Sequence, residues 1–280
     1  MKRFLISSLT FAGIALVLAE FSPVGITHAA GQAAAQNPQR GAQPAAAAAQ
    51  KTAPAKPAPR LADGHPDLSG VWWGGADVGG PGFNAGARVT GPSYTSLYQP
   101  WAAEKAKTLS DKDDPTLKCV PTAFGTLNVS LYSVGAVGQI VATPKMVVML
   151  QETFHGFQLV PTDGRPHRDD VPPSYRGDSV GHWEGDTLVV DTTNYTDNTW
   201  MFAEGRVSIH SDALHVVERY RRVDMNTLEI EARIEDPKVL TAPWNAPKQT
   251  LVLAPFDMIM SLACTGTETQ SLMDGAAKLK

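Results

Sequence analysis

The feature that most limits the fold is a series of short alternating segments after Gly138, separated by turn residues and without helical segments between them. The clearest covers residues 228–235, where Leu, Ile, Ala and Ile alternate with Glu, Glu, Arg and Glu. Alternation with a period of two gives a strand one apolar and one polar face. The second half of the chain therefore predicts a half-buried β-sheet.

Tight turns join these segments into hairpins. Glu184-Gly185-Asp186 separates predicted strands at 179–183 and 187–193, and Asp224-Met225-Asn226 separates predicted strands at 213–223 and 227–234. Further strands are expected after Gly70, at 146–150 and, as the closing strand, at 249–253, and one helix is expected at 101–109 after Pro100. Consecutive hairpins without intervening helices exclude a parallel α/β sheet.

The predicted fold class is mainly β. We expect a single antiparallel meander, closed into a barrel or strongly bent sheet of the calycin or lipocalin-like kind, with one short helix and long loops. Closure into a barrel removes the exposed strand edges that such a sheet would otherwise present.

The first thirty residues are typical of a signal peptide. Lys2 and Arg3 precede an apolar run over residues 4–18, and small residues before Ala29 and Ala30 suit cleavage there. The run is shorter than the roughly 20 apolar residues of a membrane span. No cysteine lies near the cleavage point, so we expect no lipid anchor and a periplasmic or secreted protein.

Composition divides the rest of the chain into two parts. Residues 31–62 are rich in Ala, Gln and Pro and predict a disordered linker, and residues 63–280 have the size of a single β-rich domain. Without residues 1–30 the chain has 22 Lys and Arg against 27 Asp and Glu, and no basic run. This charge argues against nucleic acid as a partner and leaves a small molecule as the expected one; the oligomeric state stays open.

The chain contains two cysteines, Cys119 and Cys264. In an oxidising compartment a disulfide between them is the favoured interpretation, with two buried thiols as the alternative. Neither cysteine has the neighbouring Cys or His that a metal site usually shows. The glycines between Gly74 and Gly91 match no phosphate-binding loop. We therefore expect no metal and no cofactor.

Polar residues on predicted strands supply the candidates for chemistry. Glu218 and Arg219 must point to opposite faces, so one of them is expected inside, either in an internal ion pair or as a general acid or base. The candidate catalytic residues are His182, Glu184, Asp191, His215 and Glu218. The candidate substrate-binding residues are Trp72, Arg165, His167, Tyr175, Trp183 and Trp200.

Residues 177–181 (GDSVG) match the pattern of a serine nucleophile elbow. The elbow requires a helix directly after the serine, whereas this segment leads into Trp183 and a hairpin turn. An esterase is therefore the less favoured interpretation.

Several segments together resemble a large family of exported bacterial proteins of uncharacterised function. The resemblance covers nearly all of the predicted domain and rests on residues 61–72 (LADGHPDLSGVW), 163–167 (DGRPH), 177–191 (GDSVGHWEGDTLVVD), 210–220 and 235–244. It implies an exported globular domain and carries no activity with it. Two departures are His182, where members often have Arg, and the absence of the arginine that usually follows Cys119 in the family pattern.

Three functions are compatible with these observations. The favoured one is a cofactor-independent acid/base enzyme of the lyase, isomerase or decarboxylase type, acting on a small aromatic or apolar compound in an aromatic-lined pocket. The second is a non-catalytic lipocalin-like binding or carrier protein that uses the same pocket. The third is an envelope-associated module whose motifs are purely structural.

Overall fold

The structure, a computed structural model, describes residues 55–74, 91–124, 137–152, 156–201 and 208–260. The chain divides into two units, Met1–Lys51 and Thr52–Lys280, and all of the described residues belong to the second unit. The predicted signal peptide and most of the predicted linker therefore lie outside the described residues. No helix in the described part has the length and apolar character needed to cross a membrane.

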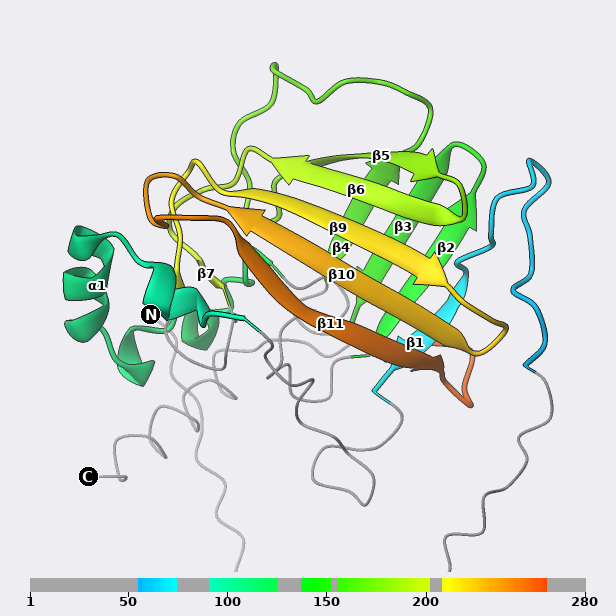
Figure 1. Cartoon of the computed structure of the whole chain (residues 1–280), viewed down its shortest axis with the longest axis horizontal. Coiled ribbons are helices and arrows are strands. Elements are labelled where there is room, and N and C mark those ends of the chain that lie inside the picture. The colour runs from blue at the N-terminus through cyan, green and yellow to red at the C-terminus, as the bar shows by residue number, and fades with distance from the viewer. Residues whose placement is uncertain (1–54, 75–90, 125–136, 153–155, 202–207, 261–280) are drawn as a thin grey trace, which may run out of the picture. The chain divides into compact units, whose positions relative to one another are not determined.

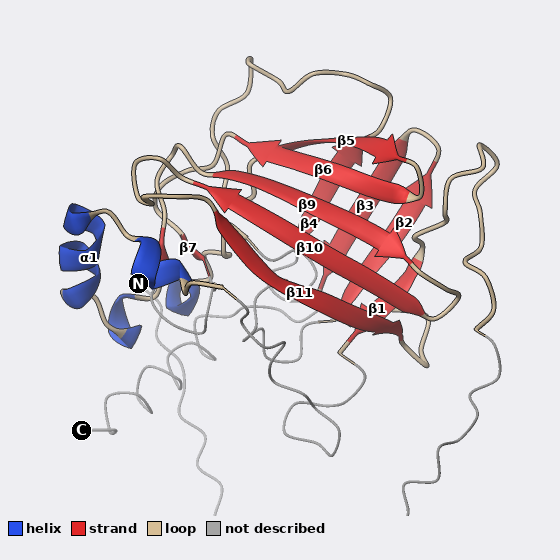
Figure 2. Cartoon of the chain, viewed as in Figure 1, coloured by secondary structure: helices blue, strands red, loops and turns tan. Residues whose placement is uncertain are grey.

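Strands dominate the described residues (Figure 2). The single α-helix, α1 (Pro100–Lys107), begins at the proline that the sequence placed before it, and it is accompanied by three short 3-10 helices, η1 (Tyr94–Leu97), η2 (Asp111–Asp113) and η3 (Pro115–Lys118). The strands are β1 (Gly70–Trp73), β2 (Gly138–Thr143), β3 (Met146–Gln151), β4 (Phe157–Pro161), β5 (Asp178–Glu184), β6 (Thr187–Thr193), β7 (Trp200–Met201), β8 (Ser208–Ile209), β9 (His215–Arg222), β10 (Thr227–Glu235) and β11 (Trp244–Leu253).

Nine strands form one antiparallel sheet in the order β4-β3-β2-β1-β11-β10-β9-β6-β5, while β7 and β8 pair separately. Figure 1 shows the sheet wrapped on itself, with β2, β3 and β4 behind β5, β6, β9 and β10. The prediction of a single antiparallel meander, closed into a barrel or strongly bent sheet with one short helix, is confirmed: the sheet is nearly closed into a barrel.

The two end strands of the sheet, β4 and β5, lie side by side without the backbone ladder that joins every other pair of neighbours. The Gln158 side chain donates to Ser179 Oγ at 2.5 Å, and a Cβ atom added at Gly181 would lie 2.8 Å from Val160 Cγ1. These contacts follow one another in the same direction along both strands, so β4 and β5 are parallel. We call the line between them the seam.

The strand count explains the seam. In a meander of nine antiparallel strands the first and last strands of the sheet point the same way, so closure brings a parallel pair together. Parallel neighbours need a long crossover connection, and residues 162–177 provide it between the end of β4 and the start of β5 (Figure 1). This loop contains the charged turn with Arg165 and His167.

The short strand β1 joins the two parts of the sheet. It pairs with β2 on one side and with β11 on the other, where the ladder consists of Trp72 opposite Leu253 and Trp73 opposite Val252. The part β1–β4 and the part formed by β5, β6, β9, β10 and β11 therefore meet at this ladder and at the seam.

An aromatic cluster fills the end of the barrel near α1. Tyr94 packs edge-to-face against Tyr98 and Trp244, with ring centroids 5.5 and 5.3 Å apart. The Tyr94 hydroxyl donates to the backbone carbonyl of Ile209, and the Ile209 N–H donates to the Tyr98 hydroxyl. The tyrosines therefore hold the β7–β8 hairpin against the barrel.

At the opposite end the segment before β1 covers the turns between strands. Arg60 makes two hydrogen bonds to the Asp186 carboxylate, and His65 stacks on Trp183 with ring centroids 4.6 Å apart. Ordered contacts therefore begin before residue 63, inside the stretch that its composition assigned to the linker.

Candidate functional site

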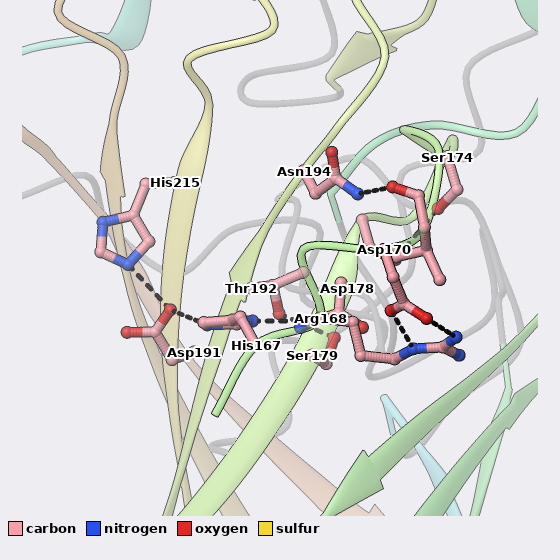
Figure 3. Close-up of polar contacts among 12 residues, drawn as sticks. His167, Arg168, Asp170, Ser174, Asp178, Ser179, Asp191, Thr192, Asn194 and His215 are labelled. Atoms are coloured by element: carbon pink, nitrogen blue, oxygen red, sulfur yellow. Dashed lines mark hydrogen bonds and ion pairs between the residues drawn. The ribbon is translucent and has the colours of Figure 1, made fainter. Parts of the chain in front are cut away.

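Two groups of ionisable residues lie on the two faces of the barrel wall. The first, which we call the outer histidine chain, consists of Asp178, His167, Asp191, His215 and Glu235. His167 lies 3.0 Å from both neighbouring carboxylates, through Nδ1 to Asp178 Oδ2 and through Nε2 to Asp191 Oδ1 (Figure 3). His215 Nε2 lies 3.0 Å from the same Asp191 oxygen, and its Nδ1 lies 3.8 Å from Glu235 Oε2.

Strand alternation explains why this chain is outside. In β5 and β6 the buried positions include Ser179, Leu188 and Thr192, so the alternate positions Asp178 and Asp191 face outward. His167 comes from the crossover loop and closes the gap between the two carboxylates. The outer histidine chain therefore fastens the loop to the barrel wall.

The charge state of His167 suits a clamp. Burial disfavours the imidazolium, but hydrogen bonds to Asp178 and Asp191 outweigh it, so the pKa of His167 is raised. Both ring nitrogens are engaged by carboxylates, which leaves neither for a substrate. His215 has one close carboxylate partner, at Nε2.

The pair His182 and Glu184 lies on the same outer face, at the far end of β5. The two side chains are 59% and 49% exposed, and Glu184 also accepts a 2.6 Å hydrogen bond from Arg219. The hydrogen bond from Arg219, followed by that from His182, lowers the pKa of Glu184. This arrangement is a solvated ion-pair network, and the catalytic role of the pair stays a prediction.

The second group lies inside the barrel around Glu218. Glu218 is 2% exposed, and the Tyr220 hydroxyl donates a 2.9 Å hydrogen bond to its carboxyl. No Lys, Arg or His among the described residues lies within ion-pair distance of it. Burial raises the pKa of Glu218 to about 7, against the opposing effect of the Tyr220 hydrogen bond.

Further hydroxyl and amide groups are buried on the inner faces of β4, β5 and β6. Gln158 donates to Ser179 and to Thr192 at 2.5 and 3.3 Å, and the two hydroxyls lie 3.0 Å apart. Burial raises the pKa of Tyr195, and the charge of Glu218 raises it further. We call these residues the interior polar group: Gln158, Ser179, Thr192, Tyr195, Glu218 and Tyr220. It borders the seam.

Ser179 does not sit in a nucleophile elbow. It is buried in β5, bonded to Gln158 and Thr192, and β5 continues through a turn into β6 with no helix between them. The less favoured esterase interpretation gains no support from this geometry.

The predicted substrate-binding residues do not converge on one place. Trp72 is fully buried with the Arg222 guanidinium 4.9 Å above its ring, and Trp200 is a second buried residue of the hydrophobic core. Trp183 is partly buried at the opposite end, while Tyr175 is 39% exposed. Arg165 is exposed and binds Asp163. A ligand-binding role for these residues stays a prediction.

The sequence indicated Glu218 as a candidate but did not indicate most of the other residues of the interior polar group. Ser179 and Thr192 occupy inward positions that alternation in 179–183 and 187–193 could have indicated. Tyr195 follows β6 in an irregular segment, where no periodic signal fixes the direction of its side chain.

Cys119 is in a disulfide bond, whereas Cys264, the other cysteine of the chain, lies outside the described residues. Among the residues that the structure describes, no group of three or more His, Cys, Asp or Glu has the arrangement of a metal site. Comparisons with protein-family models, curated proteins and solved structures find no match to this chain. The resemblance to an exported bacterial family therefore stays a prediction.

Proposed function

We propose that this protein is a cofactor-independent acid/base enzyme that acts on a small molecule inside the barrel, with Glu218 as the proton-transferring group. The observation that carries the proposal is a buried carboxyl, without a cationic partner, whose pKa is raised to about 7. A general acid or base is most effective when its pKa lies near the working pH. Buried carboxyls with such pKa values concentrate at functional sites.

The neighbouring hydroxyls support this role. Tyr220 donates to the Glu218 carboxyl and stabilises its ionised form. The carboxyl can therefore both lose and take up a proton inside the barrel. Tyr195 is the second buried phenol near Glu218, and burial keeps its hydroxyl protonated and able to donate. In an isomerisation the carboxylate removes a proton from one substrate carbon and returns it to another, while a hydroxyl stabilises the oxygen on which charge develops.

The seam is where we expect a small molecule to enter the barrel. Every other pair of neighbouring strands is joined by backbone hydrogen bonds, but the seam is closed by side chains such as Gln158 and Ser179. A small molecule entering there displaces side-chain contacts and leaves the sheet intact.

We also infer an extracytoplasmic setting, either periplasmic or secreted. The support is the signal-like sequence of residues 1–30 and the disulfide at Cys119, because disulfides persist in oxidising compartments.

The test is proton exchange in deuterated water. The purified protein is incubated with a panel of small carbonyl and carboxylic compounds, and loss of C–H signals is followed by proton NMR. We expect exchange with a pH inflection near 7 in the wild type, and a loss of about 10²–10⁴-fold in Glu218→Gln.

The matched control is Glu231→Gln, which changes an exposed carboxylate on the outer face of β10 and should leave exchange unchanged. Equal exchange in the wild type and Glu218→Gln would refute the proposal. Binding of a compound without any exchange would favour the lipocalin-like carrier instead.

A further inference from the structure

Arg176 lies next to the interior polar group and has no hydrogen-bond or ion-pair partner among the residues that the structure describes. Its side chain is partly buried just before β5. Burial lowers its pKa. A partly buried guanidinium without an acceptor has N–H groups with which it can bind a ligand.

The Arg176 guanidinium lies against the backbone at Gly156. A Cβ atom added at Gly156 would lie 2.2 Å from Arg176 Nη2 and 2.7 Å from its Cζ, so any other residue there would require the guanidinium to shift. The same position is 2.8 Å from Gln151 Oε1. Glycine at 156 therefore lets Arg176 lie against the start of β4, beside the Gln151 amide.

Tyr195 connects this arginine with the proposed catalytic carboxyl. Its ring packs at Gly177, the residue after Arg176, where an added Cβ would lie 3.2 Å from Tyr195 Cε2. The charge of Arg176 lowers the pKa of Tyr195 and the charge of Glu218 raises it, both less strongly than burial does. Arg176 and Glu218 therefore both act on the Tyr195 phenol.

We infer that the substrate is a small organic monocarboxylate, whose carboxylate binds Arg176 and whose reacting carbon lies beside Tyr195 and Glu218. This inference rests on the proposed function. A planar guanidinium with free N–H groups matches a carboxylate through two parallel hydrogen bonds. Bound in this way, the substrate supplies the acceptor that Arg176 lacks.

The surrounding charges favour a monoanion over a phosphate dianion. Arg176 is the cation that acts on Tyr195, whereas Glu218 and Asp191 both act on the phenol as acids. One cation balances one negative charge, and a second charge on the ligand would face these carboxylates.

The test measures binding of benzoate, benzamide and phenylphosphonate to the purified protein by calorimetry. We expect benzoate to bind more tightly than the other two, and Arg176→Met to weaken benzoate binding by about 10-fold or more, the usual effect of losing a charge-assisted pair. Arg176→Lys retains the charge but lacks the planar guanidinium that forms two parallel hydrogen bonds. Its affinity for benzoate should lie between those of the wild type and Arg176→Met. Arg221→Met, an exposed arginine on the outer face of β9, is the matched control.

Two outcomes overturn this inference: no benzoate binding up to millimolar concentration, or binding that is equal in the wild type and in folded Arg176→Met and Arg176→Lys. Circular dichroism establishes folding of each variant. Because Glu218→Gln should bind benzoate within about 2-fold of the wild type, the two proposals fail separately. Arg176-dependent binding without Glu218-dependent exchange supports the ligand class and refutes the enzyme.

Discussion

The outer histidine chain and the interior polar group lie on opposite faces of the same strands, and they are built from similar side chains. On β9, His215 faces outward and Glu218 inward, three residues apart. The outer imidazoles are partly exposed, and each lies 3.0 Å from a carboxylate. Glu218 accepts a hydrogen bond from a tyrosine hydroxyl and is buried with no cation within ion-pair distance among the described residues, so its charge is costly. The difference indicates that the lack of a compensating charge, more than the residue type, suits a group to proton transfer.

The largest expected effect is on the pH dependence of stability. The pKa of Glu218 rises from 4.5 to about 7 on folding, so the native protein holds this proton more tightly than the unfolded chain. Stability is fully present below pH 4.5 and falls by about 3 kcal/mol as pH rises through 7, because each pKa unit corresponds to about 1.4 kcal/mol.

Glu218→Gln should remove this loss and be more stable than the wild type at pH 8. Urea unfolding at a series of pH values measures it. If the stabilities of the wild type and of Glu218→Gln changed with pH in the same way from pH 4 to 8, the charge of Glu218 would be compensated inside the barrel. The contrast between the two faces would then disappear.

A smaller effect is expected from His167→Ala. Removing the imidazole breaks the contacts of His167 with Asp178 and Asp191, although Asp191 keeps His215 and Asp178 keeps the Arg168 N–H, and it should cost about 1–2 kcal/mol, less than a buried charged network would, because the group is partly exposed. Since the pKa of His167 is raised, its contribution is fully present below about pH 6.5 and disappears as pH rises through the native pKa.

Denaturant unfolding of this variant at pH 5.5 and pH 9, together with limited proteolysis of residues 162–177, tests the clamp. Cleavage should accelerate in His167→Ala but not in Arg165→Ala, whose side chain binds Asp163 within the loop. Unchanged cleavage in both variants would mean that the outer histidine chain does not hold the loop.

The smallest effect is expected from His182→Ala. The side chain is 59% exposed and its partner Glu184 keeps Arg219, so stability should change by less than about 0.5 kcal/mol. Thermal unfolding measures this change. If proton exchange disappeared in this variant, catalysis would belong to the outer face and the comparison would be reversed.

The sequence was sufficient to predict the architecture. Period-two segments and turns such as Glu184-Gly185-Asp186 are local signals, and they defined β5, β6, β9 and β10 to within a residue or two. The strand β11 begins earlier than expected, because a register shift opposite Glu231 accommodates Pro247, which cannot donate to a ladder.

The site was predictable only in part. The opposite orientations of Glu218 and Arg219 follow from alternation, but which of them is inside depends on how the sheet curls. His167, Asp191 and His215 were each candidates, yet their meeting depends on β6 pairing with β9 while β7 and β8 stay outside the sheet. Arg176 and Tyr195 lie in irregular segments, where tertiary contacts determine their positions.

The short ladder between β1 and β11 has a consequence for how the chain reaches this structure. Most strands pair with a neighbour close in sequence, but Trp72 must find Leu253 across almost the entire domain. Closing so long a loop is entropically the most expensive pairing in the sheet, and few hydrogen bonds reward it. The first ordered strand of the chain therefore completes its pairing only after nearly all the rest has been synthesised.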